Sequence, residues 1–275
     1  MGIPKLAVFD VDGTLVDYDG SGLAENRDAL QRLRSAGTSV AIATGRPAAI
    51  LDETLAEIGD VDYAVCSNGA TITSMATGER LRDIVLPADL IEGLVTSVRT
   101  SVPGVGTALE LGAELLEETG FARRVPPSSH DAPIDDVLEA FDATTASVHR
   151  VIFFHDDYDR DLPALAAHIQ PHLAMGCDVF HGVMLPIVEV VPAGNDKAAA
   201  LDVLAGHLGI DACEAMAFGD GLNDIEMLQW AGTGVAMANA HDDAKAIANA
   251  VAGQVADGGV AHFINALFND QESSR

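Results

Sequence analysis

The sequence predicts an α/β fold, in which a doubly wound parallel sheet is built from both ends of the chain and a smaller domain is inserted between them. Three observations support this prediction. Short apolar runs alternate with helical patterns near both ends, polar clusters follow several of these runs, and the middle of the chain is patterned less regularly. Short, nearly all-apolar strands indicate a sheet that is covered on both faces.

The first part of the chain contains three predicted strands, over residues 6–9, 39–43 and 61–66. A helix is expected over 23–36, because Leu23, Leu30 and Leu33 share one face and Gly37 stops the pattern. Pro47 follows the second strand and suits the first turn of another helix. This part therefore alternates between strands and helices.

The same alternation returns near the other end. Strands are expected over 187–191, 215–218 and 234–236, and helices over 196–208, 225–230 and 260–268. Between the two halves, the clearest elements are a strand over 148–154 and a helix over 159–169. We therefore expect a core domain formed by 1–84 plus 186–275, with an inserted domain over 85–185.

Composition excludes several classes of protein. The chain has 15 basic and 42 acidic residues, a formal net charge of −27, so nucleic-acid phosphates and anionic membranes repel it. No apolar run reaches the length of a membrane helix, the start lacks the pattern of a secretory signal, and the three cysteines do not form a metal or disulfide framework. We expect a cytoplasmic monomer or weak homodimer. A salty habitat and a biased genome both fit the acidity.

The first polar cluster places Asp10 and Asp12 directly after the first strand. Two like charges about 4 Å apart repel by about 4 kcal/mol at an effective dielectric constant of 20. A solvated turn is the alternative interpretation, since Asp and Gly both favour turns. The other clusters favour a functional site, because ligands of open parallel sheets bind beyond the carboxyl ends of the strands.

Two further clusters follow later strands. Thr44, Gly45 and Arg46 join a strand to a predicted helix, and this arrangement can hold an anion, although Thr is also an ordinary helix cap. After the strand over 215–218 come three side chains with oxygen atoms: Asp220, Asn223 and Asp224. Oxygen ligands of this kind suit a hard cation such as magnesium.

Lys197 is expected in the first turn of a helix, where the helix dipole disfavours a cation by up to about 1 kcal/mol. It is also one of only three lysines in the chain. A residue that breaks a local rule is a candidate for function, and a phosphate facing several carboxylates requires a cation. A surface lysine with its stem on apolar neighbours is the alternative.

Taken together, these clusters resemble the haloacid dehalogenase (HAD) superfamily, in the order that the superfamily has them. The stretches that carry the resemblance are Asp10-Val11-Asp12-Gly13-Thr14-Leu15, Thr44-Gly45-Arg46, Lys197 and Gly219-Asp220-Gly221-Leu222-Asn223-Asp224. The last loop, with Ser67-Asn68-Gly69-Ala70, is more narrowly similar to the Cof-type sugar-phosphate phosphatases. The resemblance implies a Rossmann-like core with an inserted α/β cap domain.

The resemblance also implies a role for each residue. Asp10 would attack the phosphoryl group and form an aspartyl-phosphate, and Asp12 would act as general acid and base. Mg²⁺ would be held by the carboxylates of Asp10 and Asp220 and by the backbone carbonyl of Asp12, with Asp224 assisting. The phosphoryl oxygens would be bound by Thr44, Gly45, Lys197 and Asn223, while Arg46 and Asn68 would face phosphate or substrate.

The implied function is a magnesium-dependent phosphatase that acts on a small phosphorylated metabolite, in particular a sugar phosphate. Two alternatives remain open. One is a phosphomutase of the phosphomannomutase type, which would return the phosphoryl group to the sugar. The other is a non-catalytic sensor of a phosphorylated ligand, which the full set of catalytic side chains disfavours.

Overall fold

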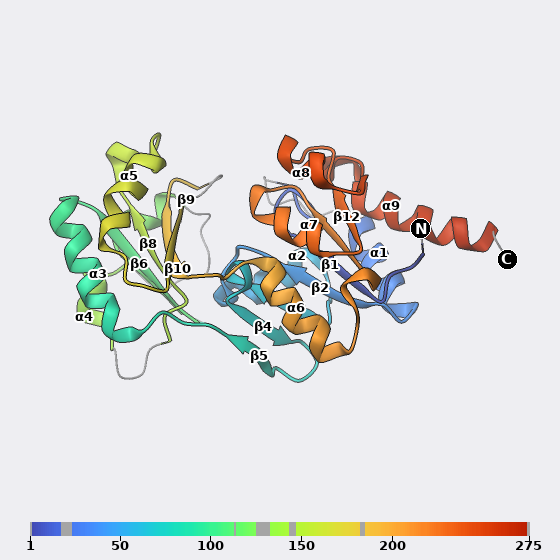
Figure 1. The fold of residues 1–275 in the computed structure, drawn as a ribbon, viewed down its shortest axis with the longest axis horizontal. Helices are drawn as coiled ribbons and strands as arrows, with labels where there is room; N and C mark the ends of the chain where they lie inside the picture. The colour runs from blue at the N-terminus through green and yellow to red at the C-terminus, as the bar shows by residue number, and fades with distance from the viewer. Residues whose placement is uncertain are drawn as a thin grey trace. The chain divides into compact units, whose positions relative to one another are not determined.

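The computed structural model describes residues 2–17, 24–112, 114–124, 133–142, 147–181 and 185–273 (Figure 1). The chain divides into two units, each with its own sheet. The first unit comprises Met1–Arg46, Leu51–Asp83 and Asp196–Arg275, and the second comprises Pro47–Ile50 and Ile84–Asn195.

In the described residues, the first unit contains an eight-stranded sheet with the order β13-β12-β11-β1-β2-β3-β4-β5. β1 is central and pairs in parallel with β11 on one side and β2 on the other. Only the β3-β4-β5 edge is antiparallel. The strands are β1 (Leu6–Phe9), β2 (Ser39–Ala43), β3 (Tyr63–Cys66), β4 (Thr71–Ser74), β5 (Arg80–Asp83), β11 (Ala215–Gly219), β12 (Thr233–Ala236) and β13 (Ala250–Val251).

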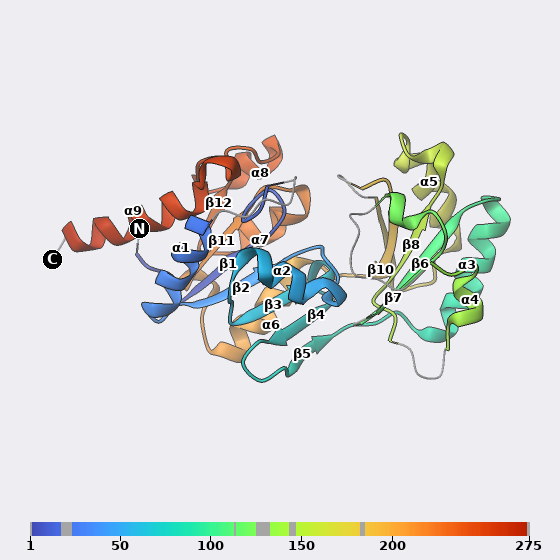
Figure 2. The ribbon, with the colours of Figure 1, turned by 180° about the vertical axis from the view of Figure 1, so that it is seen from behind.

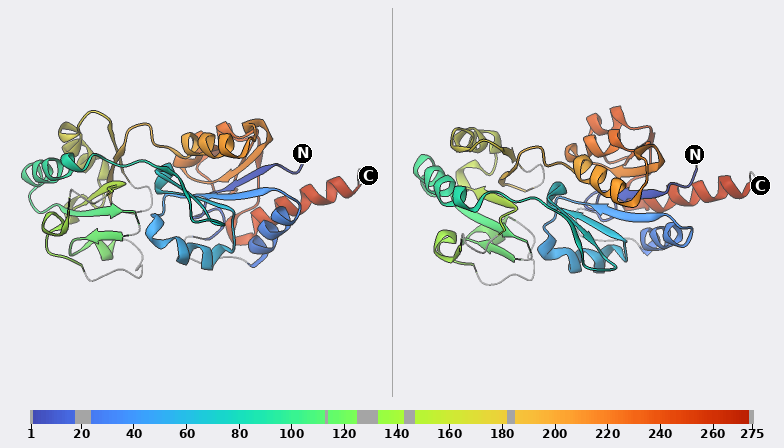
Figure 3. Two further views of the ribbon diagram at one scale, coloured as in Figure 1. Left: turned by 90° about the horizontal axis from the view of Figure 1, so that it is seen from below. Right: turned by 60° about the horizontal axis from the view of Figure 1, so that its bottom comes forward.

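Helices cover both faces of this sheet. On one face α6 packs beside α7, and α7 beside α8; on the other face α1 packs against α9, with α2 next to α1 (Figure 3). These helices are α1 (Ala24–Ser35), α2 (Leu51–Ile58), α6 (Lys197–Leu208), α7 (Ile225–Trp230), α8 (Asp242–Ile247) and α9 (Gly259–Ser273). Because both faces are covered, β1 and β11 are buried along their whole length. The predicted α/β fold with a largely parallel core sheet is confirmed.

The second unit has a separate antiparallel sheet with the order β7-β6-β8-β10-β9, and helices pack on one of its faces (Figure 2). Apolar side chains from alternate strand positions, such as Leu109, Val151 and Val190, face Val98 and Leu165 of these helices. The elements are α3 (Ala88–Ser101), β6 (Gly106–Leu111), β7 (Glu114–Glu117), α4 (Val137–Ala140), β8 (Arg150–Phe154), α5 (Leu162–Ile169), β9 (Cys177–His181) and β10 (Val188–Pro192).

The other face of this antiparallel sheet carries a buried row of charges. Arg150 on β8 donates from Nε to Glu110 Oε2 on β6 at 2.5 Å and pairs through Nη1 with Glu189 on β10. Glu110 is completely buried, so each charge depends on its partner for compensation. A slip of one residue between these strands would separate the charges, and we infer that the row helps to fix the strand register.

The described helices are short. α3 is an amphipathic helix, because it buries Ile91, Leu94, Val95 and Val98 on one face and exposes the other. No helix in the described ranges combines the length and the apolar character needed to cross a membrane.

Most predicted elements of the first unit match the structure within two residues, but several differ. The strand predicted over 187–191 is β10, which lies in the antiparallel sheet of the second unit and not in the core sheet. The last helix continues to Ser273, beyond the predicted end at 268, and α8 and β13 were not predicted. Leu23, the first residue of the predicted helix 23–36, lies outside the described residues. The segment after Pro47 begins as a 3₁₀ turn over Ala48–Ile50 before α2 starts. The hairpin of β4 and β5 was not predicted, because Arg80–Asp83 is a polar edge strand without an apolar run.

Candidate active site

Asp10 is the first residue after β1 and lies at the carboxyl end of the central strand. Its backbone N–H donates to Phe218 O at 2.9 Å, so its main chain continues the β1–β11 ladder. Phe9 stacks on Phe218 with the ring centroids 4.9 Å apart. Asp10 therefore follows directly on the buried centre of the sheet, and the close packing there limits the motion of its side chain.

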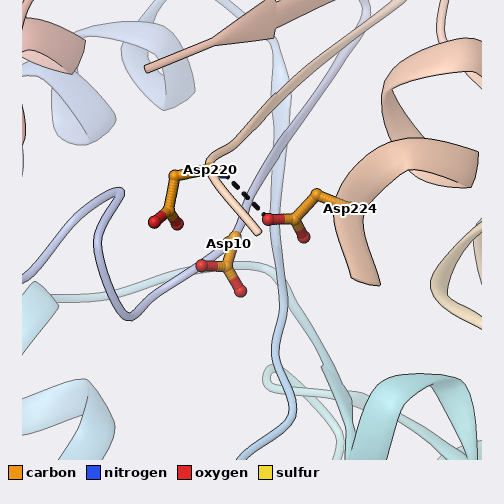
Figure 4. Close-up of side chains that lie close together, drawn as sticks. All are labelled: Asp10, Asp220 and Asp224. Carbon is orange, nitrogen blue, oxygen red and sulfur yellow. Dashed lines mark hydrogen bonds between the residues drawn. The ribbon is translucent and has the colours of Figure 1, made fainter. Parts of the chain in front are cut away.

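Three carboxylates meet at this edge of the sheet. Asp10, Asp220 and Asp224 each place one oxygen within 4.8 Å of the others, and all three residues are buried (Figure 4). Asp224 Oδ2 accepts the backbone N–H of Asp220 at 2.9 Å and of Gly221 at 2.8 Å. Thr14 donates its hydroxyl to Asp220 Oδ1 at 3.2 Å. The loop after β11 thus folds back on itself and fixes the acidic cluster.

Lys197 supplies the positive charge next to these carboxylates. It is the first residue of α6, and its ammonium donates to Asp10 Oδ1 and to Asp224 Oδ1, both at 2.6 Å. Asp196 caps the helix by accepting the Ala199 N–H at 2.7 Å, so its carboxylate turns to the helix and not to the lysine. The two ion pairs explain why a lysine is tolerated at this end of a helix.

The cluster retains an excess of negative charge, because three carboxylates face one ammonium. Burial raises the pKa of the Asp10 carboxyl well above its usual range; the charges of Asp224 and Asp220 add to this, and Lys197 opposes it. Burial alone lowers the pKa of the Lys197 ammonium, but Asp10 and Asp224 outweigh burial and raise it. A divalent cation among these oxygens would remove the excess charge.

The segment after β2 lies at the same edge, since β2 pairs in parallel with β1. Thr44 is almost fully buried, and its hydroxyl accepts the Arg46 N–H at 3.0 Å. A side chain at Gly45 would come within 3.3 Å of Asn68 Oδ1, so the glycine leaves room for Asn68. Asn68 Oδ1 in turn accepts from Asn223 Nδ2 at 2.9 Å, which joins the loops after β3 and β11.

Asp12 and Arg46 form a second group. Arg46 Nε donates to Asp12 Oδ2 at 3.0 Å and Nη2 to Asp12 Oδ1 at 2.8 Å, a bidentate pair. Its Nη1 donates to Glu57 Oε2 at 2.8 Å and to Thr54 Oγ1 at 3.2 Å, both on α2. Burial lowers the pKa of Arg46, but Asp12 and Glu57 together outweigh burial and raise it.

The loop after β3 has a strained backbone. Ser67 and Asn68 have φ values of 53° and 52°, in the left-handed region that non-glycine residues rarely adopt. Gly69 follows with φ 109°, and a Cβ there would lie 2.3 Å from Asp196 O. This loop therefore packs directly on the start of α6, one residue before Lys197. Strain of this kind is found where a site requires a fixed geometry.

The structure thus brings together most of the side chains predicted from the sequence. The buried cluster contains Asp10, Lys197, Asp220 and Asp224, while Thr44, Gly45, Asn68 and Asn223 belong to loops at the same end of the sheet. Asp12 and Arg46 instead pair with each other. Thr14, Thr54 and Glu57 also contact these residues but were not predicted from the sequence. Thr14 stood inside a recognised motif, whereas nothing in the sequence marks Thr54 or Glu57.

Comparison with known proteins identifies the family. A family model described as haloacid dehalogenase-like hydrolase matches residues 7–264. An HMP-PP phosphatase of Escherichia coli O157:H7 is 33% identical over 250 residues, which cover 86% of this chain and 85% of that protein. The 5-amino-6-(5-phospho-D-ribitylamino)uracil phosphatase YwtE of Bacillus subtilis is 28% identical over 292 residues, covering 97% of this chain and 99% of that protein.

Solved structures agree with this result. A haloacid dehalogenase-like hydrolase from Bacteroides thetaiotaomicron matches with a TM-score of 0.83 and 29% identity, over 96% of this chain and 99% of that chain. A HAD subclass IIB sugar phosphatase shares the fold, with a TM-score of 0.75 and 24% identity over 95% of this chain and 98% of that chain.

The chain belongs to the haloacid dehalogenase-like hydrolases. Within that family it is a phosphatase of the Cof type, that is, a phosphoric monoester hydrolase. The resemblance stated from the sequence is confirmed.

Proposed function

We propose that this phosphatase hydrolyses the phosphate monoester of a small metabolite, in particular a sugar phosphate, with Mg²⁺ as cofactor and through an aspartyl-phosphate. The observation that carries the proposal is the Asp10 carboxylate, which is buried between one ammonium and two further carboxylates. The names of the relatives support the substrate class, since HMP-PP and a phosphoribityl compound are both small phosphorylated molecules.

The donor set fits Mg²⁺. The buried ligands are carboxylate oxygens, which this hard cation prefers. As the family resemblance implies, the cation would be held by the carboxylates of Asp10 and Asp220 and by the backbone carbonyl of Asp12. Both oxygens of Asp224 already accept protein N–H groups, which fits an assisting role for this residue. When bound, the cation would neutralise charge on the carboxylates and on the phosphoryl oxygens.

In the first half-reaction, Asp10 attacks phosphorus, the bond to the leaving oxygen breaks, and an aspartyl-phosphate forms. Asp10 is buried at the end of a rigid strand, so little reorganisation accompanies the attack. Lys197 and Asn223, with the hydroxyl of Thr44 and the backbone N–H of Gly45, bind the phosphoryl oxygens and spread the charge that develops on them. Asn68 positions Asn223 through their hydrogen bond.

Asp12 transfers the protons. It gives a proton to the leaving alcohol in the first half-reaction and takes one from the attacking water in the second, when the bond between phosphorus and the Asp10 oxygen breaks. Its carboxylate is 47% exposed, in contrast to the buried Asp10. This difference suits a group that exchanges protons with substrate and water.

We further propose that residues 85–185 form a cap domain and that residues 1–84 plus 186–275 form the catalytic core. The antiparallel sheet with helices on one face supports a separate inserted domain, because it has its own apolar core. The unit that contains this sheet extends to Asn195 and includes β10, so it continues past the proposed boundary at 185. Such a domain would exclude water from the reaction and supply contacts to the leaving group.

Replacement of the nucleophile tests the function. We expect Asp10→Asn to reduce turnover of p-nitrophenyl phosphate by about a thousandfold or more, because an amide does not attack phosphorus. Asp28→Asn, an exposed aspartate on α1, is the matched control and should behave as the unmodified protein. Normal turnover by Asp10→Asn would remove the assigned nucleophile. Phosphate release from glucose 6-phosphate without a bisphosphate activator would separate a phosphatase from a phosphomutase.

Removal of divalent metal tests the cofactor. We expect an excess of chelator to stop turnover and added Mg²⁺ to restore it, because the acidic cluster carries more negative charge than Lys197 balances. A thermal melt in chelator serves as control and should show that the protein remains folded. Undiminished turnover in chelator would contradict the magnesium assignment.

A further inference from the structure

The guanidinium of Arg46 is already committed to protein groups. Of its five N–H donors, two engage both oxygens of Asp12, and Nη1 is directed to Glu57 and Thr54. Arg46 is only 16% exposed. Its backbone is fixed as well, since its N–H donates to the Thr44 hydroxyl and its carbonyl accepts the Ser67 N–H at 2.9 Å. Little of this side chain remains available to bind a phosphoryl group.

The groups that Arg46 contacts on its two sides differ in burial and in the elements that carry them. Asp12 lies in a loop and is about half exposed, so its carboxylate is free to adopt several rotamers without a partner. Glu57 and Thr54 stand three residues apart on α2 and thus share one face of the helix, and Thr54 is buried. The contacts therefore run from α2, through Arg46, to the half-exposed carboxylate of Asp12.

We propose that Arg46 is a positioning residue, and that Glu57 with Thr54 holds it so that it orients the Asp12 carboxylate for the attack of water on the aspartyl-phosphate. This inference rests on the proposed function, which gives Asp12 its role. A bidentate pair fixes the orientation of a carboxylate, and a general base must be oriented towards the water whose proton it takes. In that step the water oxygen bonds to phosphorus, the bond to Asp10 breaks, and the water proton passes to Asp12.

The proposal predicts a specific kinetic signature for Glu57→Gln. With p-nitrophenyl phosphate, kcat should fall about fivefold or more, while kcat/KM, which reports only the steps up to release of p-nitrophenol, stays within about twofold. Phosphoprotein captured by rapid denaturation should increase, because its hydrolysis is slowed. Arg46→Lys keeps the positive charge but not the fork, and we expect the same pattern with a larger fall in kcat.

Asp52→Asn is the matched control, since it removes the same charge from an exposed position on the same helix and should change neither constant. A parallel fall of kcat and kcat/KM would overturn the proposal, because it indicates loss of active protein or of phosphate binding. A rise in KM alone, or no change in either constant and in captured phosphoprotein, would also overturn it. Activity of Asp10→Asn would instead refute the proposed function itself.

Discussion

Lys197 shows how a residue that is unfavourable locally is stabilised by tertiary contacts. A cation at the start of a helix opposes the helix dipole. The two ion pairs at 2.6 Å with Asp10 and Asp224 outweigh that cost, and α6 delivers the ammonium to the strand ends. The same pairs leave the carboxylates dependent on the lysine, since all three groups are buried.

We therefore expect Lys197→Met to lower the free energy of unfolding by about 3 kcal/mol when measured in chelator, because it leaves two buried carboxylates without their cation. Urea titration followed by circular dichroism measures this change. Lys245→Met is the control, because that lysine forms only a distant surface pair with Asp242 at 3.9 Å and should cost less than about 1 kcal/mol. Equal effects of the two substitutions would contradict this account.

The sequence indicated which residues belong to the candidate site better than it indicated their contacts. Asp10, Asp220 and Lys197 were marked by strand ends and by the unusual helix position, and the structure brings them together. The ion pair of Arg46 with Glu57 was not evident from the sequence, because Glu57 lies on an amphipathic helix, where acidic residues are common. Side-chain pairing across elements depends on their packing, which local sequence does not encode.

The turn over Ser67–Gly69 and the start of α6 form a rigid junction. The close approach of Gly69 to Asp196 O requires the absence of a side chain, and the left-handed conformation of the turn requires a tight fit around it. Since Lys197 follows Asp196 directly, this junction determines where the ammonium lies.

Substitution of Gly69 tests the junction. We expect Gly69→Ala to destabilise the protein by more than about 2 kcal/mol and to reduce turnover, because the new Cβ would overlap a backbone carbonyl and displace Lys197. Gly78→Ala is the matched control, since Gly78 also has a positive φ of 69° but open space around it, and should cost about 1 kcal/mol without affecting turnover. Thermal melts and kcat give both readouts; equal losses in the two variants would refute the overlap.

The elements that were predicted best are the buried parallel strands, where an apolar run of four or five residues has few other interpretations. α3 and β6 were missed, although both contribute to the core of the second unit. In α3, Ile91, Leu94, Val95 and Val98 follow the i, i+3, i+4, i+7 spacing of a helix, so the sequence did carry a signal for this element. β6 is short and mixes apolar and polar residues, and this mixture does not distinguish a strand from a loop.

The large negative charge affects the protein as a whole. A formal charge of −27 on 275 residues creates repulsion between like charges that ion pairs with 15 basic residues cannot fully offset. The repulsion acts on the folded chain more strongly than on the unfolded one, because folding brings the charges closer together.

Salt should therefore stabilise the protein. Between 0.1 M and 1 M NaCl the screening length falls from about 10 Å to about 3 Å, and we expect Tm to rise by about 5 °C. Differential scanning calorimetry in chelator measures this without interference from bound divalent ions. Most of the rise should come at the lower salt concentrations if screening causes it. A constant or falling Tm would show that charge repulsion does not limit stability.

The sequence predicted the α/β fold from its rhythm at the two ends of the chain, whereas the topology of the middle had to come from the structure. β6, β8 and β10 are far apart in sequence, and the row of Glu110, Arg150 and Glu189 that joins them becomes visible only when they pair. Nonlocal pairing of this kind leaves no periodic signal.

The separation of Asp10 and Lys197 by 187 positions has a consequence during synthesis. At 5 to 20 residues per second, a ribosome takes roughly 10 to 40 s to reach the lysine after it has made the aspartate. Throughout that interval the apolar segment Leu6–Phe9 has been made, but its neighbour β11 has not. The nascent chain must therefore keep this apolar segment from aggregating for much of its translation. The ion pair of Asp10 with Lys197 can form only near the end of synthesis.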